Sequence, residues 1–493
     1  MTTPDSLTDR NAPWRQELRK AKTTKERTQT PRVVMPQLDP HYRVTCNEEV
    51  NQGLSADMAL VEASRCLDCP DPQCVSGCPV HIKIPSFIKN IERGEFLDAA
   101  RVLKLTSALP AVCGRVCPQE KQCESKCIYN TLKKAPVAIG YLERFAADFE
   151  RVDRQSHPND DPVRVPQSNG IKIAVIGSGP AGLSFAAYMA NAGYMVTVFE
   201  ALHEIGGVLK YGIPEFRLPN AVVEAEIDGL RALGVEFVKD CVIGKTLSYD
   251  DLHEMGFKGI FVGSGAGLPR FMGIPGENYI GVMSSNEYLT RINLMGAGRP
   301  GEDTPVLKGH CVAVVGGGNT AMDSVRTARR QGAARAMIVY RRSEAEMPAR
   351  VEEVAHAKEE GVEFMTLANP IEYLADEFGR VRAMKVQRME LGEPDASGRR
   401  SPVPIPGAVE EIPVDLVIVS VGVSPNPLIP NTFKDLDISR RGTIVVDEQT
   451  MHSSVADIYA GGDIVRGGAT VILAMGDGQA AGKAMDKELM HNA

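Results

Sequence analysis

Two groups of four cysteines are the residues in this sequence that most clearly indicate chemistry. Their spacings are Cys66-x2-Cys69-x4-Cys74-x3-Cys78 and Cys113-x3-Cys117-x5-Cys123-x3-Cys127. The chain has eleven cysteines, and the three outside these groups are isolated. Cysteines clustered in this way are typical of metal ligands, whereas a disulfide framework usually spreads paired cysteines along the chain. The sequence therefore predicts a metal-binding module.

Zinc and iron–sulfur clusters are the two metal sites that such thiolates favour. Cys69, Cys78 and Cys117 are each followed by Pro, as in ferredoxin-type runs that end in Cys-Pro. A zinc site would only stabilise the fold, whereas iron–sulfur clusters take electrons singly from a flavin. The nucleotide motifs described next therefore favour iron–sulfur clusters. In runs that bind two clusters, the last cysteine of one run ligates the other cluster, so the two groups need not be two separate sites.

A glycine-rich turn lies between a predicted strand at 171–176 and a small-residue helix. Its glycines have the G-x-G-x-x-G spacing, and a second strand ends in an acid. Such turns bring a pyrophosphate to the helix N-terminus, and the acid accepts hydrogen bonds from ribose hydroxyls. The predicted nucleotide contacts are Gly177, Gly179, Pro180, Ala181, Gly182 and Glu200.

Two later segments favour FAD at this first site. One is a glycine pair soon after Glu200, and the other is a glycine-rich segment near the C-terminus, at 458–482. A helix that begins there could stabilise negative charge on a reduced flavin through its N-terminal dipole. The predicted contacts are Gly206, Gly207, Gly462, Asp463, Thr470 and Val471. Because these segments lie far apart in the sequence, we expect a second domain to be inserted into the FAD domain.

A second strand–turn–helix–strand unit begins at residue 311. Its second strand ends in Arg341-Arg342 instead of an acid. Arginine offers charge-assisted hydrogen bonds to a 2′-phosphate, so this site is predicted to select NADPH over NADH. The predicted contacts are Gly316, Gly318, Asn319, Thr320, Ala321, Arg341 and Arg342, and no residue is assigned a catalytic role.

The predicted fold class is α/β, with two Rossmann-like dinucleotide-binding domains, one inserted in the other, after an α-helical iron–sulfur domain. A basic N-terminal tail is expected to be unstructured or to lie on a partner. The predicted regions are the tail at 1–45, the iron–sulfur domain at 46–150, a linker at 151–170, the first part of the FAD domain at 171–305, the NADPH domain at 306–425 and the second part of the FAD domain at 426–493.

The composition excludes several other classes of protein. A net charge of −8 argues against a general nucleic-acid-binding protein. No apolar run approaches the ~20 residues that a membrane-spanning helix needs. The first twenty residues lack the apolar core of a secretory signal. We expect a cytoplasmic protein that binds neither nucleic acid nor membranes.

The chain resembles the small (β) chains of NADPH-dependent glutamate synthase from about residue 46 onward. The resemblance includes CPVHIKIPSFIKNIERGEF, LPAVCGRVCPQEKQCESKC, VAIGYLERF and, most discriminating, MELGEPDASGRR at 389–400. Related modules occur in the N-terminal half of dihydropyrimidine dehydrogenase and in NADPH–ferredoxin oxidoreductase subunits.

The resemblance implies two [4Fe–4S] clusters with interleaved ligands. One would use Cys66, Cys69, Cys74 and Cys127. The other would use Cys78, Cys117, Cys123 and either Glu143 or Cys113. It also implies that FAD receives the hydride from NADPH and that a large (α) subunit in a hetero-oligomer makes glutamate from glutamine and 2-oxoglutarate.

Three other functions remain as alternatives. An electron-input subunit that serves ferredoxin or a pyrimidine reductase would share the fold and the cofactors. A disulfide or peroxide reductase would need a reactive cysteine beside the flavin, and only Cys241 and Cys311 lie in the nucleotide domains. A non-enzymatic binding module would not need the intact motifs. The chain has no N-terminal nucleophilic cysteine and no predicted (βα)8 barrel, so we expect the chemistry on nitrogen to occur on the partner.

Overall fold

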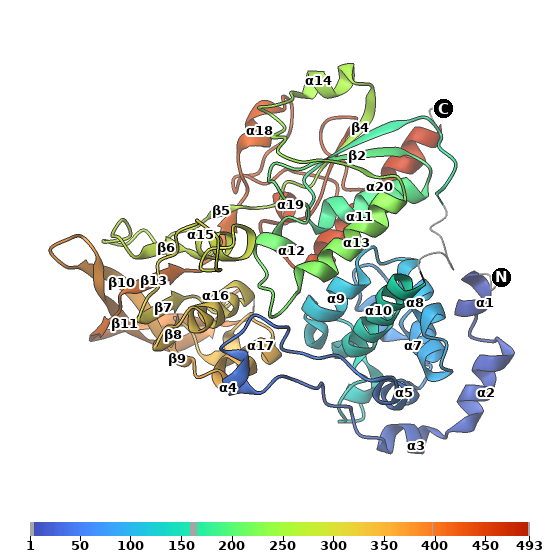
Figure 1. Cartoon of the computed structure of the whole chain (residues 1–493), viewed down its shortest axis with the longest axis horizontal. Helices are drawn as coiled ribbons and strands as arrows, with labels where there is room; N and C mark the ends of the chain where they lie inside the picture. The colour runs from blue at the N-terminus through green and yellow to red at the C-terminus, as the bar shows by residue number, and fades with distance from the viewer. Residues whose placement is uncertain (1–3, 158–164, 397, 492–493) are drawn as a thin grey trace.

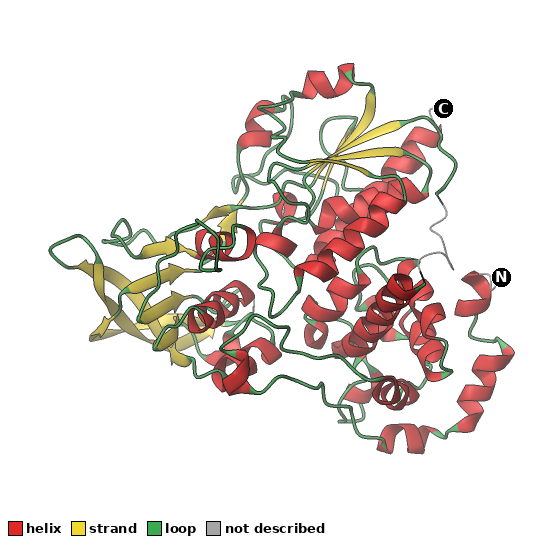
Figure 2. Cartoon of the chain, viewed as in Figure 1, coloured by secondary structure: helices red, strands yellow, loops and turns green. Residues whose placement is uncertain are grey.

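The computed structural model describes residues 4–157, 165–396 and 398–491. It has a helical region at the N-terminal end and two α/β regions, each with its own parallel sheet (Figure 1). The strands gather in the two α/β regions, while the N-terminal region is built of helices (Figure 2). Within the described residues, no helix is both long and apolar enough to cross a membrane.

The helical region packs around α7 and α10. Its helices are α5 (Ala56–Ser64), α6 (Gln73–Ser76), α7 (Ile84–Glu92), α8 (Phe96–Lys104), α9 (Pro110–Val116) and α10 (Ile139–Ser156), with three 3-10 turns at Gln119–Lys121, Glu124–Lys126 and Ile128–Asn130. Apolar residues at helical spacing face inward, including Phe87, Ile91 and Leu142, each at most 1% exposed. The cysteine loops are carried between these helices, so a packed core holds them in place.

The N-terminal segment corrects the expectation of a free or partner-bound tail. It forms α1 (Pro4–Thr8), α2 (Pro13–Ala21), α3 (Thr24–Gln29) and α4 (Pro40–Arg43) along the surface of the chain. Its basic residues find carboxylates within the same chain: Arg15 Nη2 lies 2.5 Å from Asp68 Oδ1, and Arg27 Nη1 lies 2.8 Å from Glu92 Oε1. Both arginines are buried. Buried charges need such partners, which explains why this polar segment is ordered.

Arg43 connects the N-terminal segment to the second α/β region. It is 1% exposed, and its Nε lies 2.8 Å from Glu360 Oε1. Its Nη2 donates to Glu359 Oε2 at 2.8 Å and to the His356 carbonyl at 3.1 Å. These contacts join residues more than 300 positions apart in the sequence. Arg43 therefore anchors the N-terminal segment to a domain whose residues come much later in the sequence.

The first parallel sheet has the strand order β15-β4-β1-β2-β3. Its strands are β1 (Lys172–Ile176), β2 (Met195–Phe199), β3 (Glu236–Val238), β4 (Phe257–Val262) and β15 (Ile458–Ala460). The surrounding helices are α11 (Pro180–Asn191), α12 (Val208–Tyr211), α13 (Asn220–Ala232), α14 (Tyr249–Glu254), α18 (Leu428–Thr432), α19 (Asp463–Arg466) and α20 (Val471–His491). A Cβ at Gly478 would lie 2.2 Å from the Ala181 carbonyl oxygen, so only glycine lets α20 pack this closely on α11.

The second parallel sheet has the strand order β6-β13-β7-β8-β9. Its strands are β6 (Val282–Ser284), β7 (Cys311–Val315), β8 (Arg335–Tyr340), β9 (Glu363–Thr366) and β13 (Leu416–Val419), with helices α15 (Ser285–Leu289), α16 (Asn319–Arg330) and α17 (Val351–Glu359) and a π-helical turn at Thr290–Leu294. We predicted that the second domain begins at residue 306. Because β6 pairs with β13, this domain also includes residues before 306, so the predicted boundary was too late. The sequence between β1 and β15 contains this whole sheet, so the second domain is inserted into the first. The predicted fold class is confirmed.

A third sheet was not expected from the sequence. It is antiparallel and consists of β10 (Ala368–Ala375), β11 (Val381–Pro394) and β12 (Arg400–Pro413). The long hairpin of β11 and β12 extends from the second domain (Figure 1). Two short strands, β5 (Leu268–Pro269) and β14 (Val423–Ser424), pair where the chain passes between the two domains.

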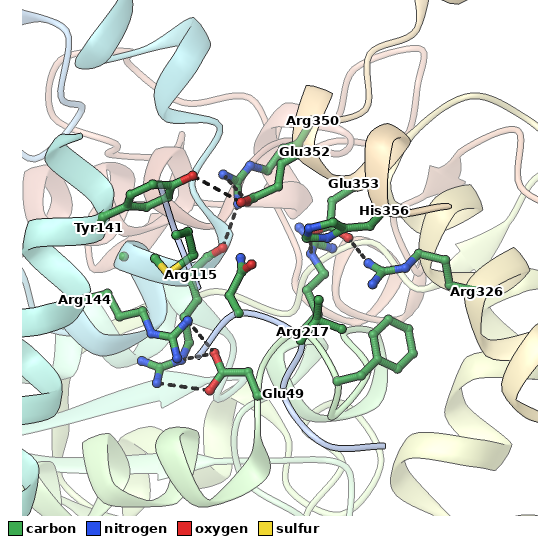
Figure 3. A pocket seen from close by; sticks show the side chains of 15 residues that line it. Glu49, Arg115, Tyr141, Arg144, Arg217, Arg326, Arg350, Glu352, Glu353 and His356 are labelled. Carbon is green, nitrogen blue, oxygen red and sulfur yellow. Dashed lines mark hydrogen bonds and ion pairs between the residues drawn. The ribbon is translucent and has the colours of Figure 1, made fainter. Parts of the chain in front are cut away.

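A polar cavity lies where the three regions and the N-terminal segment meet (Figure 3). Arg217 of the first α/β domain donates to Asp323 of the second at 2.8 Å. Arg350 of the second domain donates to the Arg115 carbonyl at 2.7 Å and to Gln119 Oε1 at 2.9 Å in the helical region. These buried charge-assisted hydrogen bonds fix the second domain against both of its neighbours.

His356 in this cavity predicts a pH-dependent contribution to stability. It is 2% exposed, and neither ring nitrogen has a hydrogen-bond partner among the described residues. Burial and the nearby Arg326 and Arg43 lower its pKa from 6.5 to about 4, against the opposing effect of Glu353 and Glu352. Because the folded pKa is depressed, the unfolded chain binds the proton more readily, and stability is lost as the pH falls through 6.5.

We expect His356→Gln to abolish about 1.4 kcal/mol of the loss in unfolding free energy between pH 7.5 and 5.5. Chemical denaturation of the loaded protein at several pH values measures this difference. His41→Gln is the matched control, because His41 is exposed. Equal pH slopes for the wild type and His356→Gln would contradict the prediction.

Candidate functional site

The glycines of the first motif shape an open cradle at the N-terminus of α11. Gly177 has φ +99°, and a Cβ there would lie 2.6 Å from the Gly263 carbonyl oxygen. A Cβ at Gly182 would lie 2.0 Å from the Gly177 carbonyl oxygen. A Cβ at Gly179, in contrast, would meet nothing within 4 Å. The turn is therefore closed on the protein side and open where a pyrophosphate would approach the helix N-terminus, which fits a bound dinucleotide.

Glu200 is held beneath this turn. It is 6% exposed, and its two carboxylate oxygens accept hydrogen bonds from the backbone N–H groups of Ser178 and Leu202, both at 2.9 Å. The Ser178 hydroxyl also donates to Glu200 and accepts a hydrogen bond from the Gly206 N–H at 2.9 Å. Ser178, which the sequence analysis did not single out, thus connects the predicted ribose acceptor to the glycine pair. Its place inside the G-x-G turn was the only sequence signal for it.

The sequence-distant segments converge on the same turn. Gly207 has φ +53°, and its added Cβ would lie 3.0 Å from Gly179 Cα. Gly462 has φ +77°, and its added Cβ would lie 3.0 Å from Ala181 Cβ. Asp463 follows directly and accepts the Ala469 N–H at 2.8 Å, while burial raises the pKa of its carboxyl. Thr470 and Val471 stand at the beginning of α20. The structure therefore brings the predicted FAD contacts together around the start of α11.

The second glycine motif, at the N-terminus of α16, has the same geometry as the first. Gly316 has φ +140°, and a Cβ there would lie 2.2 Å from the Ser420 carbonyl oxygen, while Gly318 faces open space. Ala321 is fully buried. Asn319 Oδ1 accepts the Arg350 N–H at 2.9 Å, so this side chain anchors the loop before α17. Thr320 is exposed.

Arg341 and Arg342 follow β8 but have different surroundings. Arg341 is exposed and makes no hydrogen bond or ion pair with the described residues. Arg342 is 5% exposed, and its Nη2 lies 2.5 Å from Asp395 Oδ2 in the β11–β12 turn. Both stand beyond the carboxyl end of a parallel strand, the edge at which open α/β sheets bind nucleotides.

Four thiols of the cysteine module lie together near the surface. Burial raises the pKa of Cys74, and the neighbouring Cys66, Cys127 and Cys69 raise it further. Burial likewise raises the pKa of Cys66 to about 11. Cys69, Cys74 and Cys127 are partly exposed. The thiols that affect one another are therefore those of the first interleaved set, which includes a cysteine from each run.

The other thiols are buried around Glu143. Burial raises the pKa of Cys78 to about 12, with further contributions from Glu143 and Cys117. Burial also raises the pKa of Cys123, which has Glu143, Cys117 and Cys78 as neighbours. These residues match the second interleaved set. The neighbour relations support this arrangement of ligands, which nevertheless stays a prediction.

Glu143 and Cys113 are both placed to complete the second set. Glu143 is 5% exposed, and burial raises its pKa to about 8. Its Oε1 has no hydrogen-bond partner among residues 4–157, 165–396 and 398–491. Hydrogen bonding to Cys117 and burial raise the pKa of Cys113, whose Sγ lies 3.4 Å from Met475 Sδ. An unpaired buried carboxylate is costly unless it binds a cation, so Glu143 fits a ligand position better.

The chemistry of these donors fits iron–sulfur clusters. All eleven cysteines are free thiols. Among the residues with described positions, no three His, Cys, Asp or Glu side chains converge as ligands of a single metal ion do. A cubane cluster instead takes its four thiolates at separate corners.

The buried thiols lie against the helix that begins at the flavin site. Besides the Cys113–Met475 contact, a Cβ at Gly476 would lie 3.2 Å from the Pro79 carbonyl oxygen. Gln479 Nε2 donates to the Thr106 carbonyl at 2.9 Å. Helix α20 therefore connects the start of the flavin site with the segments that carry Cys113 and Cys78.

Comparison with known proteins gives two matching family models. The model for dihydropyrimidine dehydrogenase domain II, 4Fe-4S cluster, matches residues 43–155. The model for pyridine nucleotide-disulphide oxidoreductase matches residues 171–478. The two matches are separated by residues 156–170, within the segment 151–170 that we predicted as a linker. Helix α10 extends into this segment as far as Ser156, and residues 158–164 lie outside the described part of the structure.

Among individual proteins, the glutamate synthase [NADPH] small chains of Halomonas elongata and Escherichia coli are 37% and 36% identical, and each match covers 88% of this chain and 92% of the relative. The NADP(+)-dependent formate dehydrogenase subunit beta of Moorella thermoacetica is 38% identical, but this chain spans only 60% of its length. The structure of Mycobacterium tuberculosis FprA in complex with NADPH is similar in fold, with a TM-score of 0.54 at 21% identity over 65% of this chain and 85% of FprA.

Proposed function

We propose, from the premise that this chain belongs to the family of the NADPH-dependent glutamate synthase small chains, that it is the electron-input subunit of a glutamate synthase. It oxidises NADPH and passes the electrons through FAD and two [4Fe–4S] clusters to a large subunit. That subunit makes glutamate from glutamine and 2-oxoglutarate. The chain thus works within a hetero-oligomer.

The contact between α20 and the cysteine module carries this proposal. Thr470 and Val471 begin this helix at the flavin site, and Met475 and Gly476, one turn later, touch the buried cysteine loops. Bound FAD supplies the conversion of a two-electron hydride donor into single electrons. A flavin without an electron outlet would not need this contact with the cysteine module.

Residues of the chain would orient the nucleotides. Glu200, fixed by Ser178, holds the ribose of FAD, while the turn at Gly179 lets the pyrophosphate approach the backbone. Arg341 and Arg342 bind the 2′-phosphate of NADPH. The buried Cys78, Cys117 and Cys123 would hold one cluster, and the set that includes the partly exposed Cys69, Cys74 and Cys127 would hold the other. The clusters would supply one-electron carriers, and the partly exposed set is the one that a partner could approach.

The eight clustered cysteines can serve as cluster ligands only as thiolates. This supports the expectation of a cytoplasmic protein, because cysteines stay reduced in the cytoplasm.

Anaerobic affinity purification from the native cell extract tests the proposal. NADPH oxidation by the eluate should depend on both glutamine and 2-oxoglutarate, and a large chain should co-purify. NADPH oxidation with artificial acceptors that does not depend on these two substrates would contradict the glutamate synthase role. It would not contradict the proposed cofactor sites.

A second candidate is an NADPH-dependent flavoprotein subunit that serves ferredoxin or a pyrimidine reductase. The observation in its favour is the 38% identity to a formate dehydrogenase subunit, because a module of this kind there belongs to a different enzyme. The same purification separates the two candidates by the partner that it recovers.

Iron content gives an independent prediction. With two [4Fe–4S] clusters, we expect about eight irons and about eight acid-labile sulfides per chain after anaerobic preparation. Iron and sulfide analysis, with zinc measured in the same samples, checks the number. Zinc in place of iron would refute the electron-transfer role of the cysteine module.

A further inference from the structure

The turn of the β11–β12 hairpin contacts one of the two predicted phosphate-binding arginines. The turn is closed by hydrogen bonds from the Asp395 N–H to the Arg399 carbonyl and from the Gly398 N–H to the Asp395 carbonyl, both 2.8 Å. The Asp395 side chain then reaches the second domain, where Oδ2 lies 2.5 Å from Arg342 Nη2. The two residues are 53 positions apart in the sequence.

The hairpin also holds the backbone of Arg342. The Arg342 carbonyl accepts the Leu367 N–H at 3.0 Å, and the Leu367 carbonyl accepts the N–H of Met389, in β11, at 2.8 Å. Leu367 has φ +53°, a backbone conformation that residues other than glycine rarely adopt. The third sheet and its hairpin turn therefore position both the backbone and the guanidinium group of Arg342.

One donor of Arg342 remains without an acceptor. A guanidinium is a rigid, planar fork with five N–H donors. Asp395 binds Nη2, but the buried Nε has no hydrogen-bond partner within the part of the chain that the structure describes. A buried donor without an acceptor is destabilising, so the site favours a ligand that supplies one. Arg342 stands where the adenosine ribose of a bound dinucleotide lies in this fold, and there the 2′-phosphate is such an acceptor.

We propose that Asp395 is a positioning residue for NADPH selection, which holds the Arg342 fork so that its free N–H donors meet the 2′-phosphate. This inference rests on the proposed NADPH site. Asp395 and Arg342 neutralise each other, so Arg342 contributes directed hydrogen bonds and the exposed Arg341 contributes the net positive charge. The hairpin sheet thus belongs to the nucleotide site, although it lies outside the Rossmann core.

Equilibrium binding of NADP+ and NAD+ to the anaerobic holoenzyme, measured by isothermal titration calorimetry, tests the proposal. These probes differ only in the 2′-phosphate. We expect Asp395→Ala to weaken NADP+ about tenfold and to leave NAD+ unchanged. Asp395→Glu should restore part of the loss. In an Arg342→Ala background, Asp395→Ala should have no further effect, because the residue acts through Arg342.

Glu410→Ala is the matched control, because Glu410 pairs with Arg388 on the same hairpin at 2.6 Å in an exposed position. It should leave both affinities unchanged. Three results would overturn the proposal: unchanged NADP+ affinity in Asp395→Ala, equal losses for both probes, or tighter NADP+ binding, which would show that Asp395 repels the phosphate. If Arg341→Ala and Arg342→Ala also fail to separate the two probes, the proposed NADPH site itself is wrong. If they separate the probes and Asp395→Ala does not, only the role of Asp395 is wrong.

Discussion

Replacing Arg341 and Arg342 together by Glu is expected to lower kcat/KM for NADPH by at least about 100-fold and to change kcat/KM for NADH far less. Each arginine offers charge-assisted hydrogen bonds worth roughly 1.5–3 kcal/mol, and 1.4 kcal/mol corresponds to a tenfold change. The introduced carboxylates would also repel the 2′-phosphate. NADH lacks this group, so its binding does not use these contacts.

Steady-state kinetics with an artificial acceptor measures both ratios without the partner. Arg341→Glu alone separates the electrostatic effect from folding, because Arg341 is exposed and makes no hydrogen bond or ion pair with a described residue. Arg342→Glu, in contrast, places a second carboxylate beside Asp395. Arg335→Glu reverses the same charge at the opposite end of β8 and should leave the preference for NADPH intact. Equal losses for both nucleotides in Arg341→Glu would show that this arginine does not read the 2′-phosphate.

Glu143→Ala is expected to disrupt one iron–sulfur cluster and leave the other intact. The reason is that Glu143 lies buried among Cys78, Cys117 and Cys123 with an unpartnered oxygen. Iron content should fall from about eight toward about four per chain, and one of two sets of low-temperature electron paramagnetic resonance signals should disappear. Electron transfer to the partner should fall at least tenfold, while reduction of the flavin by NADPH persists.

Glu226→Gln is the matched control for this variant. Glu226 is a second, partly buried carboxyl near Glu143; burial raises its pKa to about 7, and it accepts the Ala111 N–H at 2.8 Å. The Glu226→Gln protein should keep both clusters. If Cys113→Ala removes a cluster and Glu143→Ala does not, Cys113 is the fourth ligand instead.

The sequence predicted the parts of the molecule that depend on local geometry. Gly177, Gly182 and Gly316 are required by close contacts within or beside their own turns, so their spacing and the flanking strands and helices sufficed to predict both turns. That these turns bind the two nucleotides stays a prediction. The insertion of one domain into the other followed from the glycines around Gly462. The fold class needed no information beyond these motifs.

The features that the sequence did not reveal depend on partners far away in the chain. Asp395 is an ordinary turn residue until the hairpin brings it to Arg342. β6 is a three-residue strand whose place is fixed only by pairing with β13. Likewise, the basic N-terminal residues have the composition of a solvated tail, and only the buried Asp68 and Glu92 show why they are ordered.

The ion pair between Arg43 and Glu360 also determines when the segment around Arg43 can fold during protein synthesis. The two residues are 317 positions apart, so the ribosome adds Glu360 about 15–60 s after Arg43 at 5–20 residues per second. During that interval the segment around Arg43 has left the ribosome, but the helix that will bury it does not yet exist. The segment around Arg43 must therefore stay accessible while the middle of the chain is made, although Arg15 and Arg27 meet their partners Asp68 and Glu92 much earlier. The contacts of Arg43 are thus among the last of the fold to form.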